Sequence, residues 1–376
     1  MICSPRRIAR FCTKIALLSA GLFVFAGCSG ETDFRPRAVG LDTEILVVAD
    51  SMDWNGAVGE ALRETVGQFI STLPAPERQF ELRHAPLETE GDLEAARRRK
   101  NVIFVAAFSD STNEAAYIRN VFDSTAQQVI REEGGVAVSR ENIFRRDQQV
   151  YYITGENKED VIDAIYSESD GVSRDFNRAA RRRLTEEMFD RGRQFEVEEE
   201  LAAMYDFAVN VQHDYLIAVD TSDFVWLRRI LPETWRSVFV HFVDYADPEQ
   251  LSAEWIYNTR DSLARQYIQG NLGGWVEIDR RENRPLETKN IDFLGRYGFE
   301  TRGLWHMVGV ENGQKVEFGM GGPFITYTFY DQPTGRLYMI DGMVFAPGYN
   351  KREFLRQMEA IAYTFRSRDV SAESQG

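Results

Sequence analysis

Short apolar runs that alternate with helical patterns over residues 44–168 constrain the fold of this chain more than any other feature. EILVVA (44–49) and NVIFVAAF (101–108) are continuous apolar runs, which indicate buried strands. Between them, residues 56–73 place apolar side chains on one face of a predicted helix. Further strands are predicted at FELRHAPL, GVAVSRENIF and QQVYYITG, and further helices at 112–133 and 158–168, with a weaker one at 91–99. The expected order is β-α-β-β-α-β-β-α.

Residues 171–205 are highly charged, free of proline and rich in helix-favouring side chains. Arg181, Arg182 and Arg183 precede a block rich in glutamate, so a helix that binds a partner is one interpretation. The alternative is a solvated connecting helix or helical hairpin held by charge pairs, and this is the reading we favour.

The residues after 205 are richer in strand patterns. FAVNVQHDYLIAVD, DFVWLRRI, RSVFVHFVDY, WVEI, GLWHMVGV, KVEF, PFITYTFYD and LYMIDGMVFAP have the aliphatic and aromatic content of paired strands. PTGR (333–336) predicts the turn of the last hairpin, and Asp247-Pro248 predicts the start of a helix that runs to about residue 269. Asn350 with Glu353 forms a plausible capping box for a final helix over 351–366.

These patterns predict an α+β fold, with two α/β segments, mainly antiparallel sheets and helices packed on them, joined by the charged helical region. We divide the chain into a signal peptide (1–27), a lipidated tether (28–40), an N-terminal α/β domain (41–170), a charged helical connector (171–205), a C-terminal α+β domain (206–368) and a disordered tail (369–376).

The stretch FVFAGCSG (23–30) indicates where the protein resides. Four basic residues and no acidic one precede a short apolar run, as in a secretory signal. Phe25-Ala26-Gly27-Cys28 resembles the lipobox of bacterial lipoproteins, although leucine is more usual where Phe25 stands. The resemblance implies that Cys28 is acylated and becomes the first mature residue. The alternative is an ordinary secretory peptide in which Cys28 is incidental.

Charge and cysteine content narrow the function classes. Cleavage before Cys28 leaves 40 basic and 59 acidic side chains, a net charge of −19, which argues against nucleic acid and against broad contact with anionic lipid. Cys28 would be the only cysteine left, so no disulfide is expected once it carries lipid. The fold must then rely on its own core.

Motifs of catalysis and cofactor binding are weak in this sequence. The four histidines show no i,i+4 pair and no HExxH, and GxSxG, SxxK, Walker and GxGxxG patterns do not occur. A pair of carboxylates for glycoside hydrolysis stays open, because the acids are too many to single out two. We therefore assign no catalytic residue, no metal ligand and no cofactor.

One region has an unusual composition. Six glycines fall within residues 303–322, among Trp305, His306 and Phe318. Glycine in or beside strands marks a bulge, a close backbone approach or space for a ligand. Arg302, Trp305 and His306, with Phe324, are our candidates for a surface that receives a carboxylate and an apolar group. The alternative, which we favour, is a sharply turned pair of strands whose Trp305 packs in the core.

A resemblance to a known family rests on five stretches, which are the lipobox, EILVVADSMDWNGAVGEALRETV, FETRGLWHMVG, MGGPFITYTFYD and LYMIDGMVFAPGYNKREFLRQMEAI. Together they resemble the DUF4837 family of uncharacterised lipoproteins from Bacteroidetes and relatives. The resemblance implies an envelope lipoprotein and supplies no catalytic residue. The closing hairpin and helix also resemble, in fold only, the end of Mog1/PsbP-like α/β/α sandwiches.

We expect a lipid-anchored protein of the bacterial cell envelope, in the outer membrane, that acts as a non-enzymatic binding or assembly component. Its expected partners are the membrane, through the lipid on Cys28, and an envelope protein or a small ligand, with no nucleic acid. The alternative is an envelope hydrolase that uses acidic residues and His306. A converging pocket at His306 favours the hydrolase, and an apolar patch rimmed by charge favours the binding component.

Overall fold

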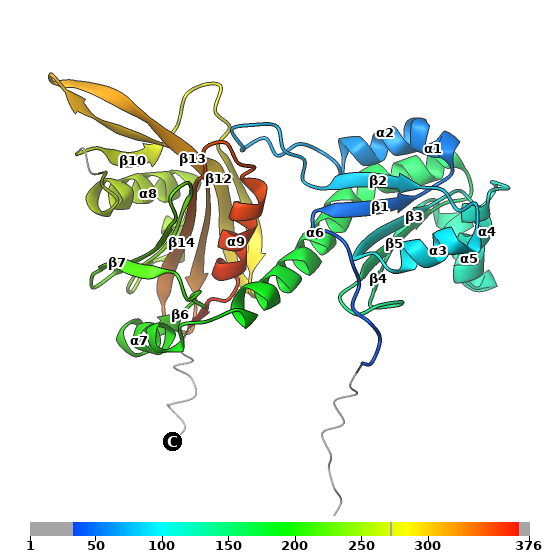
Figure 1. Ribbon diagram of the computed structural model, residues 1–376, viewed down its shortest axis with the longest axis horizontal. Coiled ribbons are helices and arrows are strands. Elements are labelled where there is room, and N and C mark those ends of the chain that lie inside the picture. Colours follow the sequence, from blue (N-terminus) through cyan, green and yellow to red (C-terminus); the bar gives the residue numbers. More distant parts are fainter. Residues whose placement is uncertain (1–32, 271–272, 368–376) are drawn as a thin grey trace, which may run out of the picture. The chain divides into compact units, whose positions relative to one another are not determined.

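The computed structural model describes residues 33–270 and 273–367 (Figure 1). The predicted signal peptide, the lipidation site Cys28 and the predicted tail lie outside the described residues. The last residues of the predicted tether form backbone hydrogen bonds with the N-terminal half. The Ala38 amide donates to the Arg146 carbonyl at 2.9 Å, and the Val39 amide donates to the Arg98 carbonyl at 2.8 Å. Within the described residues, those from Arg37 onward form one compact unit.

The N-terminal half, residues 37–190, contains a five-stranded sheet. Its elements are β1 (Glu44–Val48), α1 (Ser51–Asn55), α2 (Ala57–Glu64), β2 (Glu81–Ala85), α3 (Glu90–Arg97), β3 (Asn101–Val105), α4 (Asn113–Val121), α5 (Ser124–Glu133), β4 (Val136–Glu141), β5 (Gln149–Thr154) and α6 (Lys158–Asp190). The strand order is β2-β1-β3-β5-β4. Only β4 runs antiparallel to its neighbour, because the other strands are joined by helical crossovers.

Both faces of this sheet are covered. Side chains of α2 and α6 pack on one face, and side chains of α3, α4 and α5 pack on the other. Parallel strands buried in this way read as continuous apolar runs. The polar residues follow the strands at their carboxyl ends. Asp50 follows β1, Asp110 lies beyond β3, and Lys158 opens α6 and forms an ion pair with Asp53.

The C-terminal half, residues 194–367, is built on a larger, wholly antiparallel sheet. Its elements are α7 (Phe195–Tyr205), β6 (Phe207–Ala208), β7 (Leu216–Asp220), β8 (Phe224–Ile230), β9 (Trp235–Val243), a 3-10 turn (Pro248–Gln250), α8 (Ala253–Tyr267), β10 (Trp275–Ile278), β11 (Glu287–Phe293), β12 (Arg296–Glu311), β13 (Gln314–Asp331), β14 (Arg336–Phe345), α9 (Arg352–Ala362) and β15 (Arg366–Ser367). The strand order is β10-β12-β13-β14-β9-β8-β7, with β11 paired to β12 and with β15 and β6 forming a small separate sheet. The predicted α+β class is confirmed.

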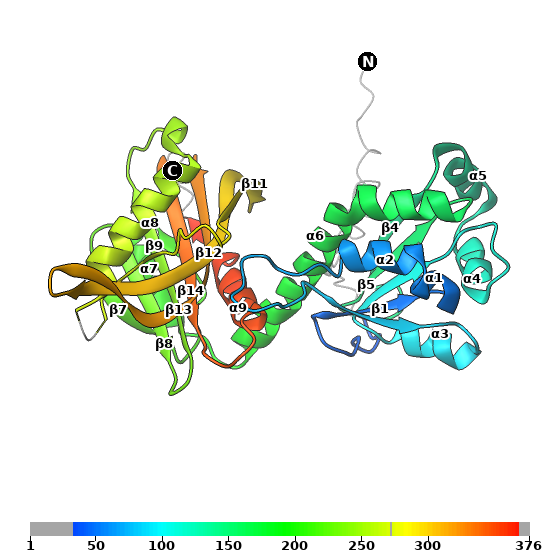
Figure 2. The same cartoon turned by 90° about the horizontal axis from the view of Figure 1, so that it is seen from above.

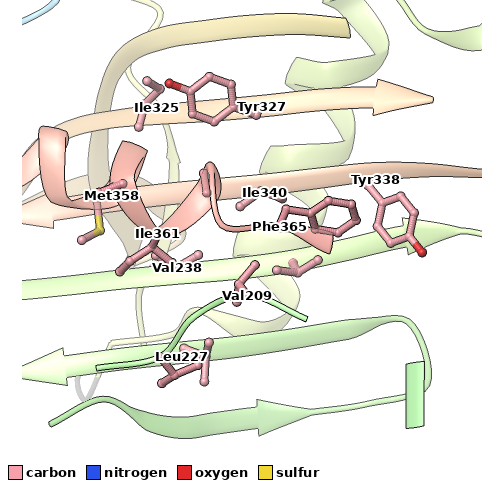
Figure 3. Packing of buried hydrophobic residues seen from close by; sticks show 14 of the residues in the cluster. Val209, Leu227, Val238, Ile325, Tyr327, Tyr338, Ile340, Met358, Ile361 and Phe365 are labelled. Atoms are coloured by element: carbon pink, nitrogen blue, oxygen red, sulfur yellow. The ribbon is translucent and has the colours of Figure 1, made fainter. Parts of the chain in front are cut away.

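Two helices cover opposite faces of this sheet (Figure 1, Figure 2). Ile256, Leu263 and Ala264 of α8 pack on one face. The other face meets α9, whose Met358 and Ile361 lie over Val238, Ile340 and their neighbours, as Figure 3 shows. Charged and polar side chains are also buried between the sheet and the helices on both of its faces.

Several predicted boundaries differ from the structure. The expected helix at 158–168 and the first part of the expected connector form one continuous helix, α6, of 33 residues. Its start was predicted correctly, since the Asn157 side chain accepts from the Asp160 amide. The capping box at Asn350 was wrong. Helix α9 has no local side-chain cap, and the Glu77 carboxylate instead accepts from the Lys351 and Arg352 amides at 2.7 and 2.9 Å.

Candidate functional site

The four candidate residues of the sequence analysis lie on two faces of the sheet. Arg302 pairs with Ile325 across β12 and β13, and Ile325 belongs to the core under α9. Trp305 and Phe324 belong to the core under α8 and are 5% and 0% exposed. Because successive side chains of a strand alternate between faces, Arg302 and His306 point away from the face that holds Trp305. The structure therefore does not bring these four residues together on one surface.

Trp305 serves packing, as the core interpretation expected. Its indole Nε1 donates to the Val344 carbonyl at 3.2 Å. Gly322 explains part of the glycine cluster, since a Cβ there would lie 2.0 Å from the Val344 oxygen. This glycine thus allows β13 and β14 to approach each other above the indole.

Arg302 lies in a cluster of charges between the sheet and α9. Its guanidinium donates to Glu300 at 2.8 Å and to Glu359 of α9 at 2.6 Å. Burial by itself raises the pKa of Glu300, but the nearby charges of Arg302 and Lys289 outweigh it and hold that pKa at about 2. The positive charge of Arg302 is therefore committed to two carboxylates of the protein itself.

His306 lies between two carboxylates on the strands that flank it. Its Nε2 is 3.1 Å from Glu277, and its Nδ1 is 3.6 Å from Glu317. Lys315 also contacts Glu277, at 2.5 Å, and Arg281 contacts Glu317, at 3.2 Å. Within the described residues, no three His, Cys, Asp or Glu side chains converge as metal ligands. The arrangement places an imidazole between two carboxylates, which are residue types used in general acid–base chemistry.

An exposed apolar surface, absent from the sequence-based candidates, occupies the end of β8 and β9. We call it the apolar end: Ile230, Leu231, Trp235 and Tyr349, with exposed fractions of 53%, 38%, 40% and 45%. Ile230 and Trp235 are cross-strand partners beside the turn closed by the Leu231 amide and the Thr234 carbonyl at 3.0 Å. Trp235 packs on Phe345, with ring centroids 5.2 Å apart. Tyr349 joins them by a hydrogen bond to Glu233 at the turn.

Charged side chains border the apolar end. Arg228, two residues before Ile230, is exposed, and Glu233 is exposed within the turn. The signal for this surface is the stretch ILPETW (230–235), which places three large apolar residues around a turn that contains proline. The strand patterns of DFVWLRRI and RSVFVHFVDY predict that the two strands pair, but they do not predict which of their residues remain exposed. Sequence reasoning therefore missed these residues.

Comparison with known proteins yields families without a described function. Residues 194–364 match DUF4837, and residues 38–189 match DUF8532; each is described as a domain of unknown function. No curated protein matches the chain. None of the helices in the described ranges is long and apolar enough to cross a membrane.

Solved structures give only distant likenesses. The Ran-binding protein Mog1p of Saccharomyces cerevisiae is 10% identical over 44% of this chain and 92% of its own, with a TM-score of 0.30. A Bacteroides thetaiotaomicron protein is 10% identical over 44% of this chain and 46% of its own, with a TM-score of 0.22. Human StAR-related lipid transfer protein 5 is 10% identical over 49% of this chain and 93% of its own, with a TM-score of 0.18. Similarity this low supports no inference about ligands.

Proposed function

Because this chain belongs to the DUF4837 family through residues 194–364, and that domain has no described function, we propose a function from the residues themselves. The protein is a non-enzymatic binding or assembly component of the bacterial cell envelope, held at the outer membrane by lipid on Cys28. Its partner is another envelope protein, which contacts the apolar end. The exposure of these four large side chains around one turn is the observation that carries the proposal.

The lipid anchor is supported by the lipobox resemblance around Cys28. Two or three acyl chains on one residue give stable anchoring, since each buried CH₂ contributes about 0.8 kcal/mol. Cys28→Ala should move the protein from the membrane fraction to the soluble fraction of lysed cells. Cys12→Ala, within the signal, is the matched control and should leave the protein on the membrane. Membrane retention of the Cys28→Ala protein would contradict the anchor.

A protein partner fits the apolar end better than a lipid surface does. Contiguous exposed apolar side chains mark interaction sites, and Trp, Tyr and Arg are enriched at the centres of protein interfaces. The apolar end presents Trp235 and Tyr349 beside Arg228. The net charge of −19 expected for the mature chain would repel anionic lipid headgroups.

Co-purification tests the partner directly. The full-length lipidated protein is crosslinked in living cells, purified, and its companions are identified by mass spectrometry. Ile230→Ser with Leu231→Ser should remove a near-stoichiometric companion without loss of folded protein, since both side chains are exposed. Tyr245→Ser, at a tyrosine that is 99% exposed elsewhere, is the control and should keep the companion. An unchanged companion in the double variant would exclude the apolar end as its contact.

The hydrolase hypothesis retains one supporting observation, which is the position of His306 between Glu277 and Glu317. An imidazole flanked by carboxylates is a common arrangement for general acid–base catalysis. Chromogenic ester and glycoside substrates should then be cleaved by the purified protein and spared by its His306→Asn variant. Cleavage that persists in His306→Asn, or no cleavage by the unaltered protein, would leave the binding function as the sole proposal.

A further inference from the structure

Two arginines lie directly opposite each other where β8 and β9 approach the apolar end. Arg229 and Arg236 are cross-strand partners, and Arg236 lies on the face that meets α9. There its guanidinium lies over the Phe354 ring, 5.0 Å from the centroid, and donates to the Gln357 side chain. Like charges in this position destabilise a sheet unless another group compensates them.

The protein supplies only one compensating charge. Asp214, just before β7, forms an ion pair with Arg229. Among the described residues it is the only carboxylate in ion-pair contact with either guanidinium. Two guanidiniums and one carboxylate leave a single positive charge in excess. Arg236 is 4% exposed, and a buried charge without a counter-charge is costly.

Four buried polar atoms of this group make no hydrogen bond within the described residues: the Tyr215 hydroxyl, the Nε atoms of Arg229 and Arg236, and Oδ1 of Asp214. Tyr215 is 2% exposed, and buried tyrosine hydroxyls usually find an acceptor. Three of the four atoms are hydrogen-bond donors, and Oδ1 of Asp214 is an acceptor. Donors outnumber acceptors here by three to one, and the one carboxylate already pairs with Arg229, so a further acceptor with a negative charge fits the group.

We infer that Arg229, Arg236 and Tyr215 form a binding site for an oxyanion group, a carboxylate or a phosphoryl group of a small molecule. Arginine suits such a group because its planar set of N–H donors matches two oxygens. One bound oxyanion would accept from the Tyr215 hydroxyl and from Arg236, and its charge would balance the pair of guanidiniums. The site is separate from the partner contact proposed above and does not depend on it.

Burial sets the direction of entry. Tyr215 and Arg236 form the floor of the site, whereas the side chains of Arg229 and Asp214 keep 21% and 25% of their surface exposed. The anion thus enters past Arg229, with the rest of its molecule toward solvent. Burial also lowers the pKa of Arg236, which an anion beside it would raise again.

Thermal unfolding in matched salts tests the site. The full-length protein, in non-ionic detergent at pH 7, is titrated with sodium phosphate or sodium acetate against sodium chloride of equal ionic strength. At least one oxyanion should raise Tm in a saturable way, because a ligand that binds only the folded state stabilises it. A response to phosphate alone identifies a phosphoryl site, and a response to acetate alone identifies a carboxylate site.

Three variants make the test specific. Arg229→Gln should raise the oxyanion concentration needed for half of the Tm increase roughly ten- to a hundredfold, the usual loss for a charged donor. Arg228→Gln, on the opposite face of the same strand, should leave that concentration unchanged. Tyr215→Phe should weaken the response yet unfold no earlier than the parent protein in chloride, because its hydroxyl has no partner to lose. A Tm rise that Arg229→Gln and Tyr215→Phe retain in full would overturn the inference, as would Tm values that never differ from chloride.

Discussion

The two sheets of this protein place their charges differently. In the N-terminal half, β3 and β5 are buried along their whole length, and the acidic and basic groups gather beyond the strand ends, as at Asp110 and Lys158. In the C-terminal half, charged groups enter the layers between sheet and helices. Arg260 of α8 and Asp341 of β14 are both 0% exposed and bond at 2.7 Å.

The difference follows from how each sheet is covered. Parallel strands with helices on both faces leave no room for polar side chains except at the ends. The antiparallel sheet is covered by fewer helices, and charged side chains pair between helix and strand, as Arg260 of α8 does with Asp341 and as Glu359 of α9 does with Arg302. A buried ion pair contributes little net stability, but breaking it is expensive because it leaves one charge alone. Charges should therefore matter more for folding in the C-terminal half.

The largest effect should follow loss of Asp341. Asp341→Ala leaves the fully buried Arg260 without its counter-charge and should lower the free energy of unfolding by about 4 kcal/mol. Asp110→Ala in the N-terminal half should cost less than about 1 kcal/mol, because Asp110 lies at a partly exposed strand end. Denaturant unfolding of both variants measures the contrast, and equal losses would break it.

Arg302 comes next. Arg302→Ala leaves Glu300 and Glu359 facing each other with less compensation and should lower the free energy of unfolding by about 3 kcal/mol. Arg131→Ala removes an ion pair with Glu156 in which both side chains are exposed, Arg131 at 43% and Glu156 at 44%. This change should cost less than about 1 kcal/mol. An Arg302→Ala protein as stable as the parent would instead favour the ligand-facing role expected from the sequence.

Glu300 should make stability depend on acid pH. Its pKa of about 2 is lower than its value in the unfolded chain, about 4.5. The carboxylate therefore stabilises the fold fully above pH 4.5, and this contribution disappears as the pH falls toward 2. Glu300→Gln should cost about 3 kcal/mol at pH 7, with the difference from the parent shrinking below pH 4.5. A difference in stability that stays constant down to pH 2 would contradict the view that Arg302 and Lys289 lower the pKa of Glu300.

The smallest effect concerns the cap of α9. Glu77→Ala leaves the Lys351 and Arg352 amides without their acceptor and should cost about 1 kcal/mol, as for other lost N-caps. Glu353→Ala removes the residue that the sequence offered as a capping partner and should cost almost nothing. Thermal unfolding of the two variants decides which carboxylate caps the helix.

Local patterns were sufficient for the N-terminal strands and for the start of α6. Continuous apolar runs such as NVIFV have few structural alternatives, and Asn157 with Asp160 forms a cap from residues three apart. The same reasoning failed at α9, because Glu77 is distant in sequence and no local pattern reveals it. The sequence also did not show which face of the sheet each β12 side chain occupies, because a run rich in glycine and aromatic residues has no clear alternation of apolar and polar positions.

The apolar end and the paired arginines could not be predicted for a related reason. Ile230 and Trp235 resemble ordinary strand residues in the sequence, and only the folded structure shows that they are 53% and 40% exposed. The opposition of Arg229 and Arg236 depends on the register of β8 and β9, which the stretch LRRILPETWR does not specify. Pairing across strands, rather than composition, creates both features.

The most direct measurement is site-specific photo-crosslinking in living cells, with a photoreactive amino acid at position 230 in one strain and at position 245 in another. Our account predicts one major crosslinked envelope protein from position 230 and none from position 245, although both side chains are exposed. The same products from both positions, or none from position 230, would contradict the proposal that the apolar end binds a partner.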